Sequence, residues 1–127
     1  MRRFHFILGW CTLAMFLLTG QLMRHHSPPL ITMSDSVRLL YRSRHLYILA
    51  AGLLHLTLGL YWQPFEGWRR RAQSGGSLLL AAAVPLLVAA FFTEPGQQLS
   101  RGTPWSHFGL YSLFGGTMLH ALGGIKR

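Results

Sequence analysis

The sequence predicts an all-α fold, an integral membrane bundle of four transmembrane helices that forms a single domain over residues 1–127. Hydrophobic residues make up 50% of the chain, and charged residues make up 12%, about half the share in soluble proteins. Each of four stretches without Asp, Glu, Lys or Arg is long enough to cross a hydrocarbon core of about 30 Å as a helix. These stretches cover residues 4–23, 46–65, 72–93 and 102–125, and we place the spans at about 4–23, 46–63, 76–93 and 105–124.

The basic residues predict the orientation of these spans. All 12 Lys and Arg residues lie at span ends or in connections. With a cytoplasmic N-terminus, seven of them lie on the cytoplasmic side and five on the other, which favours a bacterial inner membrane protein with both termini in the cytoplasm. The net charge of +9 is not gathered on a soluble module, so nucleic acid is not an expected partner. The expected partners are the lipid bilayer and other membrane proteins or further copies of the chain.

The first span carries its small and polar residues on one face. His5, Gly9, Thr12 and Thr19 follow one another at spacings of four, three and seven residues, while bulky apolar side chains occupy the rest of the helix. These spacings place all four residues along one side of a helix. We expect this side to contact neighbouring helices.

The second helix is predicted to extend beyond the bilayer at its N-terminal end. Ser34, Asp35 and Ser36 are capping residues, and no Pro or Gly follows them before Gly52. A helix that begins near Asp35 therefore runs well ahead of the span at 46–63. Its early turns carry basic residues at the level of the lipid headgroups.

Within this span, glycine and histidine predict contacts with other helices. His45, Gly52 and Gly59 repeat every seven residues and form a seam, which we expect to pack on the glycine-rich fourth span. His55 lies about 15 Å deeper than His45, near the middle of the membrane, and needs a partner there. We expect a neutral His55 bonded to a hydroxyl or a backbone carbonyl of a neighbouring helix. A ligand, proton-relay or cofactor role is the alternative.

The third span follows a predicted connection over residues 63–76 and ends at an acidic residue. Pro85 removes a backbone donor inside the span and is expected to kink it. Glu94 stands at the C-terminal end, where the helix dipole disfavours an anion, so we expect it to pair with Arg42 or Arg44. The predicted polar cluster consists of Arg42, Arg44, His45, Glu94 and Arg101.

The fourth span has the strongest packing pattern in the sequence. Small and polar residues recur at spacings of three and four, and they place His120 on the contact face and His107 on another side. The residues of this stripe are Gly109, Ser112, Gly116, His120 and Gly123.

Four short spans with several histidines are similar in general architecture to the small membrane-bound cytochromes b, in which paired histidines hold haem. His107 and His120 are 13 residues apart, which rotates them by about 140° and disfavours two haems on one helix. A single haem b would lie between His5 and His120 or between His45 and His107. We predict no cofactor, with haem b as the alternative.

Two further function classes have weaker support. The three acidic residues all lie at helix ends, whereas ion-coupled transporters usually carry a carboxylate inside the membrane. A small oligomeric transporter with His55 in its pathway is therefore an alternative only. The sequence contains no serine, histidine and acid arrangement and no phosphate loop, although Arg42, Arg44 and His45 would suit a lipid-modifying enzyme. The adjacent His25 and His26 do not make a metal site.

The remaining hypothesis is a non-enzymatic membrane protein. Its glycine-lined helix faces suit close packing within the bundle and against partners. The sequence therefore favours an accessory subunit, or an assembly or stabilising factor, of a larger membrane complex.

Overall fold

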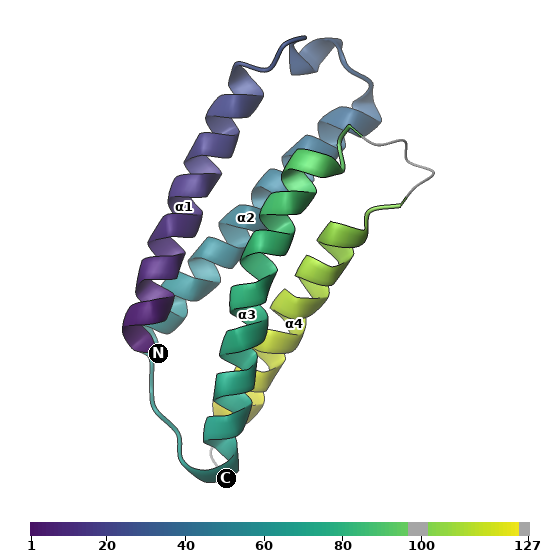
Figure 1. Ribbon diagram of the computed structural model, residues 1–127. Coiled ribbons are helices and arrows are strands. Elements are labelled where there is room, and N and C mark those ends of the chain that lie inside the picture. The colour runs from purple at the N-terminus through teal and green to yellow at the C-terminus, as the bar shows by residue number, and fades with distance from the viewer. Residues whose placement is uncertain (97–101, 125–127) are drawn as a thin grey trace.

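The computed structural model describes residues 1–96 and 102–124, and these residues form four long α helices, one 3-10 turn and no β-strand. Consecutive helices run in opposite directions, so the N-terminus lies at the same end of the bundle as the end of the fourth helix (Figure 1). The predicted all-α class is confirmed for the described residues. The helices are α1 (Arg2–Arg24), α2 (Asp35–Tyr61), α3 (Gly67–Thr93) and α4 (Pro104–Gly124), and the 3-10 turn is η1 (Leu30–Thr32).

The helices pack as two hairpins. α1 packs mainly on α2 and α3 mainly on α4, while contacts between α2 and α3 join the hairpins. Glycine permits the close approach within each pair. A Cβ at Gly59 of α2 would lie 2.7 Å from the backbone of Phe6, and a Cβ at Gly116 of α4 would lie 2.8 Å from the carbonyl oxygen of Gly76. Such distances are shorter than van der Waals contact.

The contact face predicted for the first span is confirmed, but the expected partner of the α2 seam is wrong. The buried residues of α1 are His5, Gly9, Thr12 and Thr19, the four that the spacing predicts. Gly52 and Gly59, however, face Leu13 and Phe6 of α1 rather than α4. The α2 glycines therefore meet the helix before them in the chain, α1, and the α4 glycines meet α3.

The second helix begins where the sequence predicts, and the third begins earlier than predicted. α2 begins at Asp35, as expected. α3 begins at Gly67 and includes the three arginines 69–71, which the sequence placed in a connection. Gly67 has a φ of +60°, a conformation that favours glycine at the turn into the helix. Gly76 does not break α3, because it packs against α4 and is held there by tertiary contacts.

Two of the described helices, α1 and α3, are long and apolar enough to cross a membrane. α2 contains an uncharged stretch of similar length, but it ends at Tyr61, so that a span of 18 residues would have to include Arg44 and His45. α4 is uncharged, but with its glycines, serines and two histidines it does not reach the hydropathy expected of a membrane span. A helix without charged residues is thus not always apolar enough to count as a candidate membrane span, and of the described helices only α1 and α3 meet both requirements.

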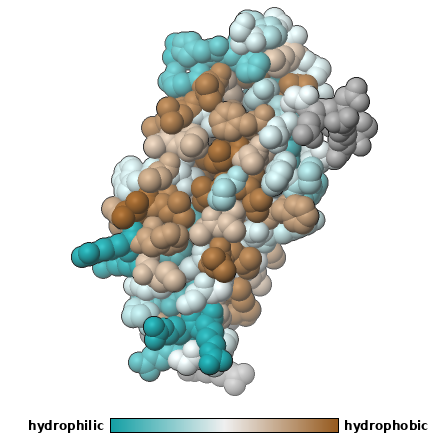
Figure 2. Space-filling model, in the orientation of Figure 1, coloured by the Kyte–Doolittle hydropathy of each residue, from teal (hydrophilic) through white to brown (hydrophobic). Residues whose placement is uncertain are grey.

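Apolar residues lie both inside the bundle and over much of its outer surface. On the face shown in Figure 2, hydrophobic residues cover the middle of the molecule and hydrophilic residues gather towards the two ends. The interior of the bundle contains an apolar core built from α2, α3 and α4. This core consists of Ile48, Ala51, Leu80, Ala83, Leu87, Phe91 and Leu113.

Candidate functional site

The interior of the bundle also contains two polar clusters. Every buried side-chain nitrogen and oxygen among the described residues has a hydrogen-bond partner. We call His5, His55, Ser77 and His120 the histidine cluster, and Arg44, Glu94 and Ser106 the Arg44–Glu94 cluster.

The histidine cluster contains one residue from each of the four helices. Nδ1 of His5 (α1) lies 2.7 Å from Nδ1 of His55 (α2), and Nε2 of His5 lies 2.9 Å from Oγ of Ser77 (α3). The same Ser77 oxygen lies 3.1 Å from Nε2 of His120 (α4). The ring of Trp62 covers this group, with its centroid 5.3 Å from that of His5 and 5.8 Å from that of His120.

A single backbone carbonyl fixes the direction of these hydrogen bonds when the rings are neutral. Nε2 of His55 lies 3.1 Å from the carbonyl oxygen of Leu80, which only accepts, so this nitrogen carries the ring hydrogen. Nδ1 of His55 then accepts from Nδ1 of His5, and Nε2 of His5 is left as an acceptor for the Ser77 hydroxyl. The carbonyl of Gln73, 2.9 Å from the same hydroxyl, competes for its single hydrogen.

Glycine packing produces the helix register that brings the four residues together. Gly59 meets Phe6 and Gly9 meets Leu56, and these contacts place the adjoining His5 and His55 side by side. In the other hairpin, Gly76 meets Gly116, which places the next residue of α3, Ser77, within reach of α4. The His5–His55 contact therefore joins the same two helices as the Gly59 contact, and the Ser77–His120 contact joins the same two as the Gly76 contact.

Of the two histidine pairs considered for haem, one lies together in the structure and the other does not. His5 and His120 are brought together, with the Ser77 hydroxyl between them. His45 and His107 have no hydrogen bond in common within the described part of the chain. His45 bonds Thr19 at 2.9 Å, while the exposed His107 bonds the carbonyl of Thr103 in its own helix at 2.7 Å. Among the residues described, no group of three or more His, Cys, Asp or Glu residues is arranged to hold a metal ion.

The Arg44–Glu94 cluster lies towards the other end of the bundle. Nε of Arg44 donates to Oε2 of Glu94 at 2.7 Å, and both side chains are buried. Arg44 also donates to Oγ of Ser106 at 2.9 Å, and the Ser106 amide donates to Oε1 of Glu94 at 2.8 Å. Burial raises the pKa of Glu94, but hydrogen bonds from Ser106 and Arg44 outweigh it and hold this pKa below its ordinary value. The cluster joins α2, α4 and the end of α3.

The sequence identified part of this cluster. Arg44 is the one of the two expected arginines that pairs with Glu94, whereas Arg42 is exposed and His45 faces Thr19 instead. Arg101, the remaining predicted member, lies outside the described residues. Ser106 was not predicted, although it stands in the first turn of α4, where backbone amides lack partners within the helix and attract a carboxylate.

His55 has the type of partner that the sequence predicts, the backbone carbonyl of Leu80 on a neighbouring helix. Sequence reasoning did not pair His55 with His5, and it did not identify Ser77. No protein-family model, curated protein or solved structure matches the chain. The chemistry of its own residues is therefore the basis for the function proposed below.

Proposed function

We propose that the chain is a four-span integral membrane protein that serves as a non-enzymatic accessory or stabilising subunit of a larger membrane complex. The observation that carries this proposal is the distribution of polar and apolar groups. Buried polar side chains are paired inside the bundle, whereas large apolar side chains are exposed on all four helices. A soluble monomer rarely exposes so much contiguous apolar surface, but lipid and membrane partners cover it readily.

The outer face of α4 supports its assignment as a span. Its large outward side chains are mostly apolar or aromatic, and water would contact all of them if the helix lay outside the membrane. The residues are Phe108, Tyr111, Phe114, Met118 and Leu122. Its buried positions are mostly small, namely Ser106, Gly109, Gly116 and Gly123, so the low hydropathy of α4 arises on its inner side.

The same argument applies to α2. Two of its polar residues within or next to the predicted span are buried and paired, Arg44 with Glu94 and His55 with the carbonyl of Leu80. The exposed Thr57 donates to a carbonyl of its own helix. The exposed positions of this part of the helix include Leu46, Leu53 and Leu60. We place the chain in a bacterial inner membrane with both termini in the cytoplasm. The arginines 69–71 lie at the same end of the bundle as the N-terminus, and cytoplasmic ends of membrane proteins are rich in basic residues.

The interior offers little support for an enzyme or a transporter. Within the histidine cluster and within the Arg44–Glu94 cluster, the polar atoms form hydrogen bonds that join one helix of the bundle to another. The apolar core, including Ile48, Leu80 and Leu87, lies between the two clusters. A polar pathway through one copy of the chain would have to cross this core, and ion-coupled transport usually relies on a carboxylate within the membrane.

Gentle detergent extraction tests the accessory role. The tagged chain is extracted from membranes of its native host, separated by native electrophoresis and examined by mass spectrometry. An accessory subunit migrates with a larger assembly and the same partner proteins in repeated preparations. Migration as a small homo-oligomer without other proteins contradicts the proposal and favours a transporter.

The haem b alternative has one observation in its favour, the convergence of His5 and His120. Iron would have to replace Ser77 as the partner of both rings. An absorbance spectrum of the same extracted fraction examines this possibility. A Soret band that disappears in the His120→Gln variant would support haem binding.

A further inference from the structure

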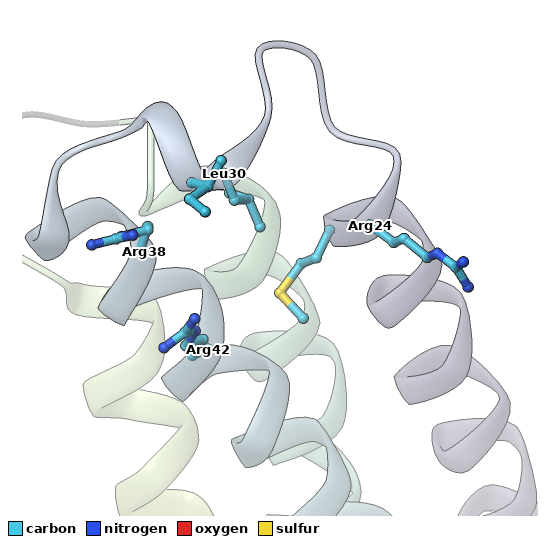
Figure 3. A pocket seen from close by; sticks show the side chains of 6 residues that line it. Arg24, Leu30, Arg38 and Arg42 are labelled. Atoms are coloured by element: carbon cyan, nitrogen blue, oxygen red, sulfur yellow. The ribbon is translucent and has the colours of Figure 1, made fainter.

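A cavity of about 340 Å³ lies at the end of the bundle where α1 connects to α2. It combines three arginines with three apolar residues. The residues that line it are Met23, Arg24, Leu30, Ile31, Arg38 and Arg42 (Figure 3). They come from the last turn of α1, from η1 and from the early turns of α2. The cavity is separate from the two buried polar clusters.

The charges around this cavity favour an anion. Arg38 forms an ion pair with the exposed Asp35. Within the described part of the chain, Arg24 and Arg42 have no salt-bridge partner. The residues at this cavity therefore carry three positive charges, and one of them is paired with a carboxylate. Arg38 and Arg42 lie one turn apart on α2, while Arg24 stands on α1 and extends outward from the rim (Figure 3).

The apolar residues of the cavity indicate which kind of anion fits. Met23 and Leu30 are partly buried, and Ile31 is 79% exposed in a connecting segment. A free phosphate ion gains nothing from such surface, whereas the acyl chains of a lipid cover it. The position also fits, because Arg24 follows the first predicted span and Arg42 precedes the second, at the level of the headgroups.

We propose that this cavity binds an anionic glycerophospholipid, with Arg38 and Arg42 contacting the headgroup phosphate and Met23, Leu30 and Ile31 contacting the adjoining acyl chains. The inference rests on the proposed membrane topology and not on the accessory role. Arg24 lies at the rim and extends away from Arg38 and Arg42 (Figure 3), so it would contact a neighbouring headgroup. Arg42 differs in this respect from Arg44, whose charge is already neutralised by Glu94.

Lipid retention measured by native mass spectrometry tests the site. The purified full chain in mild detergent is incubated with phosphatidylglycerol or phosphatidylcholine that carry the same acyl chains. The test variant is Arg38→Gln with Arg42→Gln, and the matched control is Arg69→Gln with Arg70→Gln at the other end. Both variants lose two positive charges. If the double variant unfolds at a lower temperature than the unaltered chain, the single variant Arg42→Gln replaces it as the test variant, because Arg42 is exposed.

The expected result is preferential retention of phosphatidylglycerol by the unaltered chain. Each ion pair between an exposed arginine of the cavity and the headgroup phosphate contributes about fivefold, so the test variant should bind phosphatidylglycerol about 25-fold more weakly and Arg42→Gln about fivefold more weakly. The control should change by less than about twofold. Equal retention of the two lipids, or equal losses in test and control variants, would overturn the proposal.

Two further measurements distinguish a lipid site from a free phosphate site and check that the chain is embedded in the membrane. Inorganic phosphate at millimolar concentration should leave the bound lipid in place, and its displacement would identify a free phosphate site instead. An alkaline wash of the membranes removes peripheral proteins and leaves integral ones. If the chain stays in the membrane but shows no lipid preference, the inference fails and the assignment as an integral membrane protein stands. If the wash releases the chain, that assignment fails and the headgroup site fails with it.

Discussion

Arg44 and Glu94 form an ion pair inside the bundle, with 2.7 Å between Nε and Oε2, although they are 50 residues apart in the chain. Neutralising one member leaves a buried charge without its partner, which costs about 3–5 kcal/mol. We expect Glu94→Gln to lower the free energy of unfolding by about this amount, measured by denaturant unfolding in detergent. Glu66→Gln alters an exposed carboxylate and is the control. Equal stabilities of the two variants would contradict the structural role of the pair.

The same carboxylate predicts how stability depends on pH. Because the folded-state pKa of Glu94 is held below its ordinary value of 4.5, the ionised carboxylate stabilises the fold fully above that value. This stabilisation is lost as the pH falls below 4.5 and through the lower folded-state pKa. Unfolding midpoints measured from about pH 7 to pH 3 should show an acid-induced loss that is smaller in Glu94→Gln. Parallel curves for the two proteins would exclude this assignment.

Ser77 is expected to stabilise the histidine cluster through its hydroxyl. Ser77→Ala removes the group between His5 and His120 and leaves a ring nitrogen of the buried His5 and one of the partly buried His120 without that partner. We expect a loss of about 1–3 kcal/mol in the free energy of unfolding. Ser74→Ala, one turn earlier at an exposed position, should have a small effect. If Ser74→Ala were the more destabilising change, the hydrogen-bonding role of Ser77 would be incorrect.

Gly59 is expected to control the approach of α1 to α2. In Gly59→Ala the added Cβ would lie 2.7 Å from backbone atoms of Phe6, so the helices must separate. Overpacking of this kind costs about 1–3 kcal/mol. Gly75→Ala is the control, because its Cβ would only meet Leu119 at 3.8 Å and alanine favours a helix. Thermal unfolding should separate the two variants, and similar midpoints would argue against close packing at Gly59.

The sequence predicted those features that depend on one helix at a time. The spacing of His5, Gly9, Thr12 and Thr19 defines the buried face of α1 without knowledge of its neighbour. The position of Glu94 at a helix end, on the same side as several arginines, was enough to predict its pairing. The first inference uses the geometry of one helix, and the second uses charge and the predicted order of the spans.

The features that depend on helix pairing and register could not be predicted. Gly59 identifies a close contact, but nothing in the sequence shows that the contact lies on α1 rather than α4. The pairing of His5 with His55 follows from this register. Ser77 follows two glycines and has the composition of an ordinary packing position, so its role between two histidines emerges only when three helices are placed together.

The central claim, that all four helices cross the membrane, is tested most directly by labelling single cysteines with a membrane-impermeant thiol reagent on intact cells. The variants are Ser27→Cys, Glu66→Cys and Gly96→Cys, each made with Cys11→Ser, and all three positions are exposed. Four spans with cytoplasmic termini predict labelling at 27 and 96, and labelling at 66 only after the cells are opened. If α1 and α3 alone crossed the membrane, positions 27 and 66 would label together and 96 from the opposite side, which would contradict the four-span bundle.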